Sequence, residues 1–192
     1  IEDLLRRTRR LLAAYQESGG ESPVLLIHDG AAGADRARSL VEPAGHVLPI
    51  TVEEVASLGL EAWLSALAYG ARAVRLLDTP AVPARSRREL DEQLGFARAL
   101  LLALGYPERA VDWLGEGAEA LAPVMPVLEP ARHAAVGTKR QIMFAAIDHL
   151  HAQATQPHPL TSLPAGAPFG TAEVDAKACT LCLACVTACP GK

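Results

Sequence analysis

Four cysteines lie close to the end of the chain, at Cys179, Cys182, Cys185 and Cys189, and none precedes them. Their spacing is C-x2-C-x2-C-x3-C, and Pro190 follows the last one. Thiolates are strong ligands for soft metals, and a cluster this tight is typical of a metal site rather than of scattered core thiols. The sequence therefore predicts that all four cysteines bind metal.

Three kinds of site could use this run. A disulfide framework is disfavoured, because a chain that builds its core without cysteines does not need cross-links at one end. Structural zinc sites usually hold two ligand pairs separated by a longer spacer, which is missing here. The spacing and the final proline are instead those of the bacterial iron–sulfur run. We expect an iron–sulfur site, with zinc or unmetallated thiols as the alternatives.

Residues 168–190, PFGTAEVDAKACTLCLACVTACP, resemble the first half of a bacterial two-cluster 4Fe–4S ferredoxin domain. The resemblance implies that Cys179, Cys182 and Cys185 bind one cluster, whereas Cys189 binds a second cluster with cysteines from a later run. No second run is present in these 192 residues. We expect two clusters in an intact protein that continues beyond Lys192, and poor iron incorporation by this stretch alone. The alternative is that all four cysteines bind one cluster.

The rest of the chain alternates between short apolar runs and amphipathic stretches. We expect strands at residues 24–28, 45–50, 73–77 and 110–114. Helices are expected at residues 31–41, 52–70, 87–105 and 133–153. This alternation predicts an α/β fold, a small flavodoxin-like parallel sheet with helices on both faces, followed by a C-terminal ferredoxin-like segment.

Local signals at the helix ends refine this prediction. Thr51 with Glu54, and Ser86 with Glu89, have the spacing of capping boxes, and Gly70 and Gly105 are expected stops. The predicted organisation has five parts, namely an N-terminal helix and linker (1–22), the α/β domain (23–122), a Pro-rich connection with a helix (123–153), a linker (154–172) and the truncated ferredoxin segment (173–192). Because the first residue is Ile1, we also expect missing sequence upstream.

Residues 24–114 resemble the delta-subunit (iron–sulfur subunit) family of methyl-viologen-reducing hydrogenases, through IHDGAAGAD, VEEVASLGLEAWLSALAYGARAVRLL and ALGYPERAVDWL. Members of that family relay electrons and carry cysteines in two loops, one after the first strand and one after the third. Here those loops, residues 28–35 and 78–83, contain no cysteine. The resemblance therefore implies a retained scaffold that has lost its own thiolate-bound cluster.

Other side chains suggest weaker sites. The GAAGAD loop is glycine-rich and opens a helix, so it could bind an anion such as a nucleotide or flavin phosphate, but it lacks the G-x-G-x-x-G pattern. His28 and Asp29 could suggest a catalytic pair, although neighbours on a strand end point in opposite directions. We interpret them as a loop pair and expect Asp78 to take part in a turn or cap.

Helical spacing disfavours a metal pair at His149 and His151, which are two residues apart and which we expect to face solvent. Trp63 and Trp113 are more typical of core residues than of electron relays.

Composition limits the functions open to the chain. Its net charge of −4 argues against nucleic acid as the main partner, and no apolar stretch is long enough for a membrane span. The leading prediction is a cytoplasmic electron-transfer module of a larger iron–sulfur protein, with redox proteins as partners and no bond chemistry of its own. The alternatives are a docking scaffold with a structural cluster, or a flavin- or nucleotide-binding domain.

Overall fold

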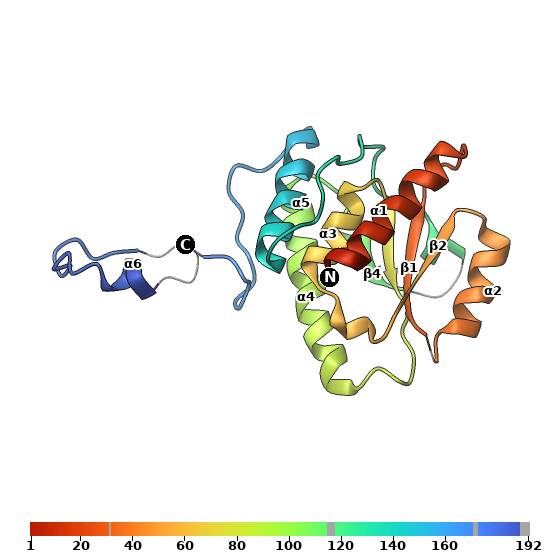
Figure 1. Ribbon diagram of the computed structural model, residues 1–192, viewed down its shortest axis with the longest axis horizontal. Coiled ribbons are helices and arrows are strands. Elements are labelled where there is room, and N and C mark those ends of the chain that lie inside the picture. Colours follow the sequence, from red (N-terminus) through yellow and green to blue (C-terminus); the bar gives the residue numbers. More distant parts are fainter. Residues whose placement is uncertain (31, 115–117, 171–172, 189–192) are drawn as a thin grey trace.

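A four-stranded parallel sheet forms the centre of the computed structural model, with strand order β2-β1-β3-β4 (Figure 1). The strands are β1 (Val24–Asp29), β2 (Val47–Val52), β3 (Ala73–Leu76) and β4 (Val111–Trp113). The structure describes residues 1–30, 32–114, 118–170 and 173–188. This order is the one that a flavodoxin-like sheet has in its first four strands, so the α/β part of the predicted fold class is confirmed, whereas the ferredoxin-like segment stays a prediction.

The helices lie between and after the strands. They are α1 (Glu2–Glu17), α2 (Ala34–Ala44), α3 (Leu60–Ala68), α4 (Ala84–Ala103), α5 (Lys139–Gln153) and α6 (Ala184–Ala188), with short 3-10 turns η1 (Val55–Ser57), η2 (Glu108–Ala110) and η3 (Ala118–Leu121). None of the described helices combines the length and the apolar character that a membrane span requires.

The two faces of the sheet bury separate cores, because side chains alternate along a strand. Leu25 and Ile27 of β1 point into the larger core, which α1, α3, α4 and α5 complete. Val24 and Leu26 point to the other face, where α2 and η3 cover a smaller core. The expectation of helices on both faces is therefore confirmed.

Helix α3 is buried along its whole length, since all nine of its residues are buried. It packs between the sheet and helices α1, α4 and α5. Trp63 is completely buried there, as expected of a core residue. The helix ends just before Gly70, and α4 ends just before Gly105, where both glycines adopt the positive φ values that favour glycine.

Several predicted helix starts are wrong. Thr51 lies in strand β2, so it does not cap a helix, and α3 begins only after the turn η1. Ser86 lies inside α4, whose N-cap is Pro83. Thr51 instead pairs with His28 of β1, so the strand pairing overrode the local signal, and α4 has already begun at Ala84 when the chain reaches Ser86.

The last helix of the body also starts later than predicted, and α2 is shifted toward the C-terminus. Helix α5 begins at Lys139, behind a capping box that Thr138 and Gln141 form with each other's backbone N–H groups. This box has the required spacing in the sequence. Helix α2 runs over Ala34–Ala44 instead of 31–41 because the residues before it form the turn after β1.

The N-terminal helix is part of the body rather than a separate appendage. Leu5 and Leu12 of α1 are 2% and 0% exposed and belong to the larger core. Glu2 accepts a hydrogen bond from Gly137 N–H at 2.8 Å, which ties the start of α1 to the residues before α5. The exposed arginines of α1 lie on the opposite side of the helix.

Replacing Leu12 with alanine tests this packing. We expect Leu12→Ala to lower the free energy of unfolding by about 2–5 kcal/mol, because it leaves a cavity in the core. Urea denaturation followed by circular dichroism measures the change. Leu102→Ala is the control, since Leu102 is 56% exposed, and should change stability by less than about 0.5 kcal/mol. Equal losses in the two variants would contradict the packing of α1.

Strand β4 is held to α4 by a buried carboxylate. Asp112 is 4% exposed and receives hydrogen bonds from Arg98 and Arg109, both at 2.6 Å. Burial alone would raise the pKa of Asp112, but the hydrogen bonds and positive charges of Arg109 and Arg98 outweigh it and hold the pKa below its ordinary value. The ionised form is therefore the one that stabilises the fold.

This pKa shift has a defined consequence for acid stability. A carboxyl whose folded pKa is lowered stabilises the fold above its unfolded pKa of about 3.9, and that contribution is lost as the pH falls through the folded pKa. We expect Asp112→Asn to lower the free energy of unfolding at neutral pH, and the difference from the natural chain to shrink below about pH 4. Urea denaturation at several pH values measures it. A difference that is independent of pH would contradict this role for Asp112.

Candidate functional site

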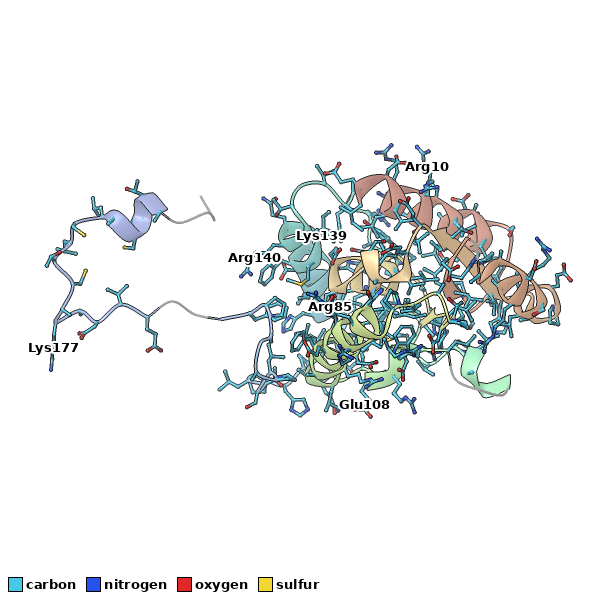
Figure 2. The ribbon with its side chains drawn as sticks, turned by 90° about the horizontal axis from the view of Figure 1, so that it is seen from below. Arg10, Arg85, Glu108, Lys139, Arg140 and Lys177 are labelled. Atoms are coloured by element: carbon cyan, nitrogen blue, oxygen red, sulfur yellow. The ribbon has the colours of Figure 1, made fainter. Side chains whose placement is uncertain are left out.

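The described part of the cysteine segment, residues 173–188, projects away from the α/β body (Figure 1). In Figure 2, Lys177 of this segment lies well apart from Lys139 and Arg140 on the body. Every described residue of the segment is exposed, and the hydrogen bonds it makes stay within it, as in Cys179 N–H to Asp175 O at 2.9 Å. The body therefore does not cover the thiols.

The described thiols belong to Cys179, Cys182 and Cys185, and all three are free and exposed. The backbone turns on both sides of Cys182, because Leu181 and Leu183 adopt φ values of 56° and 60°. These values lie in the left-handed region, which branched residues rarely occupy. Cys189 lies outside the described residues, so its predicted ligand role stays a prediction.

The surroundings of Cys182 favour its thiolate form. Hydrogen bonds to its sulfur from the backbone N–H of Ala184 and the hydroxyl of Thr180 lower the pKa of this thiol. A lower pKa increases the fraction of thiolate, which is the form that binds metal and reacts with electrophiles.

The donor set of this segment fits iron or zinc in its chemistry, since thiolates bind both. Its geometry is not that of a closed site. Among the described residues, no three cysteine, histidine, aspartate or glutamate side chains lie close enough to hold a metal ion. A segment without packing of its own would gain its structure when it binds metal, because binding and folding are coupled in small metal sites.

The second candidate region is the edge of the sheet where the strands end. Asp29, the last residue of β1, is 6% exposed. Its Oδ1 accepts hydrogen bonds from the N–H groups of Ala32 at 2.7 Å and Gly33 at 3.0 Å, and its Oδ2 accepts one from the Thr79 hydroxyl at 2.9 Å. Two amides of the GAAGAD loop, those of Ala32 and Gly33, therefore already bind a carboxylate of the chain itself.

His28 and Asp29 are not a loop pair, because both are buried in β1. Their side chains have different partners, however, as the alternation of a strand requires. His28 Nε2 lies 3.2 Å from the Thr51 hydroxyl of β2, whereas Asp29 turns to Thr79. The pair has no arrangement in which the carboxylate orients the imidazole for catalysis.

A cavity of about 250 Å³ opens at this edge, between the loops that follow β1, β2 and β3. Three carboxylate residues line it, namely Asp29, Glu53 and Glu54. Its described lining includes no lysine or arginine, so its charge disfavours the phosphate groups of a nucleotide or flavin cofactor.

The loop after β3 is fixed by a second ion pair. Asp78, expected to take part in a turn or cap, accepts a hydrogen bond from the Arg87 guanidinium of α4. That guanidinium also lies over the ring of Trp113, 5.3 Å from its centre. Trp113 donates from its indole N–H to Asp91 at 2.7 Å and is half-buried, so it is less deeply buried than expected of a core residue.

His149 and His151 were both expected to face solvent, and one of them does. His151 faces solvent, whereas His149 is half-buried and its Nε2 lies 2.9 Å from Glu129 O. Neither belongs to a group of metal-binding side chains within the described ranges.

Two polar pairs were missed at the sequence level. Thr79 lies 50 positions from Asp29, and no local pattern links them. Glu61 is buried on α3 and pairs with Lys139 of α5 at 3.0 Å. A signal for Glu61 existed, since it is the one charged residue in the otherwise apolar stretch LGLEAWLSALA.

Comparison with known proteins adds no relative to these observations. No protein-family model matches the chain, and a search of curated protein sequences finds no similar protein.

Substitution of Asp29 tests whether its carboxylate stabilises the loops after β1 and β3. We expect Asp29→Ala to lower the free energy of unfolding by about 1–3 kcal/mol or more, because it leaves the buried N–H groups of Ala32 and Gly33 and the hydroxyl of Thr79 without their acceptor. The measurement is urea denaturation. Asp35→Asn is the control, since the Asp35 side chain is 96% exposed. A loss no larger than the control's would argue against this role for Asp29.

Proposed function

We propose that this chain is an electron-transfer module of an iron–sulfur protein, in which the C-terminal cysteine segment binds 4Fe–4S clusters and the α/β body carries that segment. The observation that supports the proposal most strongly is the separation of the two parts. All cysteines fall within residues 179–189, and the described ones are exposed on a segment that the body does not cover. An electron carrier needs its redox group close to the surface, where a partner can approach.

Cys179, Cys182 and Cys185 would hold the first cluster. Cys189 would serve a second cluster, or the same one if the four cysteines act together. A bound 4Fe–4S cluster would supply reversible one-electron chemistry at low potential. The protein's own contribution would be hydrogen bonds to sulfur of the kind that Ala184 N–H and the Thr180 hydroxyl direct to Cys182, since such bonds tune the potential of a cluster.

The absence of cysteine at the carboxyl edge of the sheet fits a division of roles in which the C-terminal segment binds the clusters and the body carries it. In the resembled hydrogenase family the loops after the first and third strands carry cysteines, whereas here Asp29 and Thr79 join the two loops directly. We infer that the body no longer binds metal and serves as a carrier. The expected partners are redox proteins of the cytoplasm.

A docking scaffold with a structural cluster is the second candidate, because the described cysteine segment exposes apolar side chains to solvent. Leu181 and Leu183, on either side of Cys182, are 80% and 62% exposed. The flavin or nucleotide alternative is the weakest at the GAAGAD loop. There the amides of Ala32 and Gly33 are already hydrogen-bonded to Asp29, and the adjoining cavity is acidic.

Anaerobic reconstitution with iron and sulfide tests the proposal. Because the resemblance assigns three cysteines of this run to one cluster, we expect poor iron incorporation by the 192-residue chain alone and clearly higher incorporation when an excess of a small thiol supplies the remaining ligand. Iron and sulfide analysis, with electron paramagnetic resonance after dithionite reduction, measures the bound cluster. Voltammetry then asks whether the cluster has a reversible one-electron couple.

Two variants make the result specific. Cys182→Ser should abolish iron binding, whereas Thr187→Ser, on the same segment, should leave it unchanged. If the chain retains no iron under either condition, or retains it equally in Cys182→Ser, the iron–sulfur proposal fails. If a bound cluster shows no reversible couple, electron transfer fails and the scaffold remains.

A further inference from the structure

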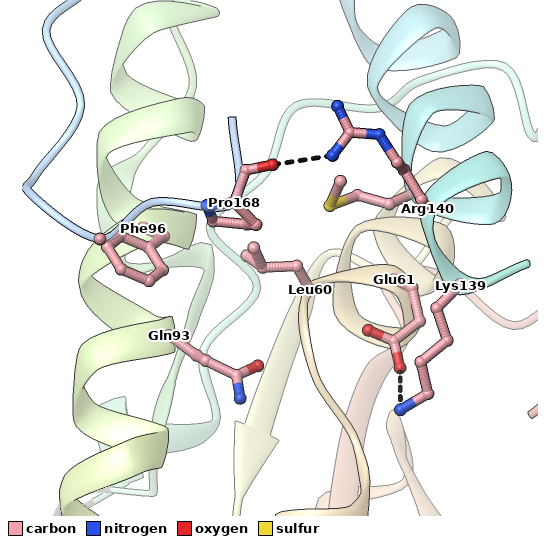
Figure 3. Close-up of a pocket in the computed structure, with 9 residues that line it drawn as sticks. Leu60, Glu61, Gln93, Phe96, Lys139, Arg140 and Pro168 are labelled. Carbon is pink, nitrogen blue, oxygen red and sulfur yellow. Dashed lines mark hydrogen bonds and ion pairs between the residues drawn. The ribbon is translucent and has the colours of Figure 1, made fainter. Parts of the chain in front are cut away.

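A cavity of about 350 Å³ lies on the larger-core side of the body, between α3, α4 and α5 (Figure 3). Its apolar walls come from Leu60, Phe96 and Met143, and Gly166 and Pro168 of the segment before the cysteines lie over it. This volume falls within the range of small-molecule sites, which are typically apolar with a few converging polar groups.

The segment over the cavity is held in place by α5. Arg140 donates a hydrogen bond to Pro168 O at 3.0 Å, and its guanidinium lies 5.0 Å from the centre of the Phe144 ring. Phe169 meets Phe144 edge to face, with 5.9 Å between the ring centres. The wall that this segment adds to the cavity is therefore anchored to α5.

One wall carries a buried carboxylate. Glu61 is 7% exposed, and its Oε1 is buried without a hydrogen bond. Lys139 Nζ lies 3.0 Å from this oxygen, so the two form an ion pair without hydrogen-bond geometry. Lys139 compensates the charge of this oxygen, but a buried ion pair is favourable only when hydrogen bonds also satisfy its remaining lone pairs, and a ligand N–H would supply one.

A second polar group lies beside the first. A side-chain carbon at Gly59 would collide with both Gln93 Oε1 and Glu61 Oε2, so the ends of these two side chains approach the same stretch of backbone. Gln93 is half-buried, and its amide makes no hydrogen bond within the described chain. Figure 3 shows Gln93, Glu61 and Lys139 at the same end of the cavity.

We propose that this cavity binds a neutral, planar lactam heterocycle of two or three fused rings. The N–H of the lactam would donate to Glu61, and its carbonyl would accept from Lys139 or the Gln93 amide. A lactam suits the cavity because its neighbouring donor and acceptor would meet a neighbouring acceptor and donor of the protein. The ligand is neutral because Lys139 balances the charge of Glu61, and the third charged residue of the lining, Arg140, is already engaged by Pro168 O and the Phe144 ring. Its rings would lie against Leu60, Phe96 and Met143, where apolar surface would be removed from water.

Titration of the 192-residue chain with quinazolin-4(3H)-one tests the site. This bicyclic lactam is small, so we expect a Kd on the order of 1 mM. Amide chemical shifts in ¹H–¹⁵N correlation spectra measure binding, and the largest changes should fall on Gly59, Leu60, Phe96 and Gly166. The 3-methyl derivative, which lacks the N–H, should bind at least tenfold more weakly.

Variants separate this site from non-specific binding. Glu61→Leu keeps the side chain's size but removes the acceptor, and we expect it to weaken binding at least tenfold. Glu42→Gln is the matched control, since Glu42 is exposed on α2 across the sheet, and it should bind as the natural chain does. Circular dichroism confirms that each variant is folded. Absence of shift changes at the cavity, equal binding of the methylated compound, or equal binding by folded Glu61→Leu would each overturn the proposal.

Discussion

The structure depends on the burial of strand β1 on both of its faces. All six residues from Val24 to Asp29 are buried, and β1 lies between β2 and β3 in the sheet. A parallel strand in this position must be covered by helices on both sides. Helices α1, α3, α4 and α5 are therefore needed on one face, and α2 with η3 on the other. Because α1 takes part in this cover, the N-terminal segment is part of the folded body.

The same burial explains the polar chemistry at the end of β1. His28 and Asp29 are the last residues of a strand that has no access to solvent, so their polar atoms need partners within the protein. Thr51 of β2 meets His28, and Thr79 together with two loop amides meets Asp29. In many parallel sheets this edge binds a ligand. Here the protein's own carboxylate satisfies the loop, which leaves the edge acidic and closed to phosphate groups.

The body and the cysteine segment differ in how much of their surface is buried. The body buries its apolar side chains in two cores and contains no cysteine, whereas the described cysteine segment has no buried residue. A metal bound by its thiols, as proposed, would supply the structure that packing does not provide. The anchored residues Pro168 and Phe169 mark the place where the body's hold on the chain ends, so a cluster bound beyond them would reach partners without contacting the sheet.

Sequence patterns predicted the fold well where burial is regular along the chain. The four apolar runs form strands, and helices α3 and α4 end just before Gly70 and Gly105, as expected. The capping box at Thr51 failed because this residue pairs with β1 in the sheet, and the one at Ser86 failed because α4 already begins at Ala84. Thr79 could not be assigned to Asp29, since only the pairing of β1 with β3 brings them together.

The sequence by itself determined that the chain has an α/β body without cysteines and a concentrated run of thiols, because periodicity and spacing are local properties. Only the tertiary structure decided which polar groups meet. Asp29 closes the loop next to it with the help of Thr79, and Glu61 faces Lys139 beside a cavity. These contacts join elements far apart in the chain. They exist because helices must pack on both faces of one sheet, and that packing brings distant residues together.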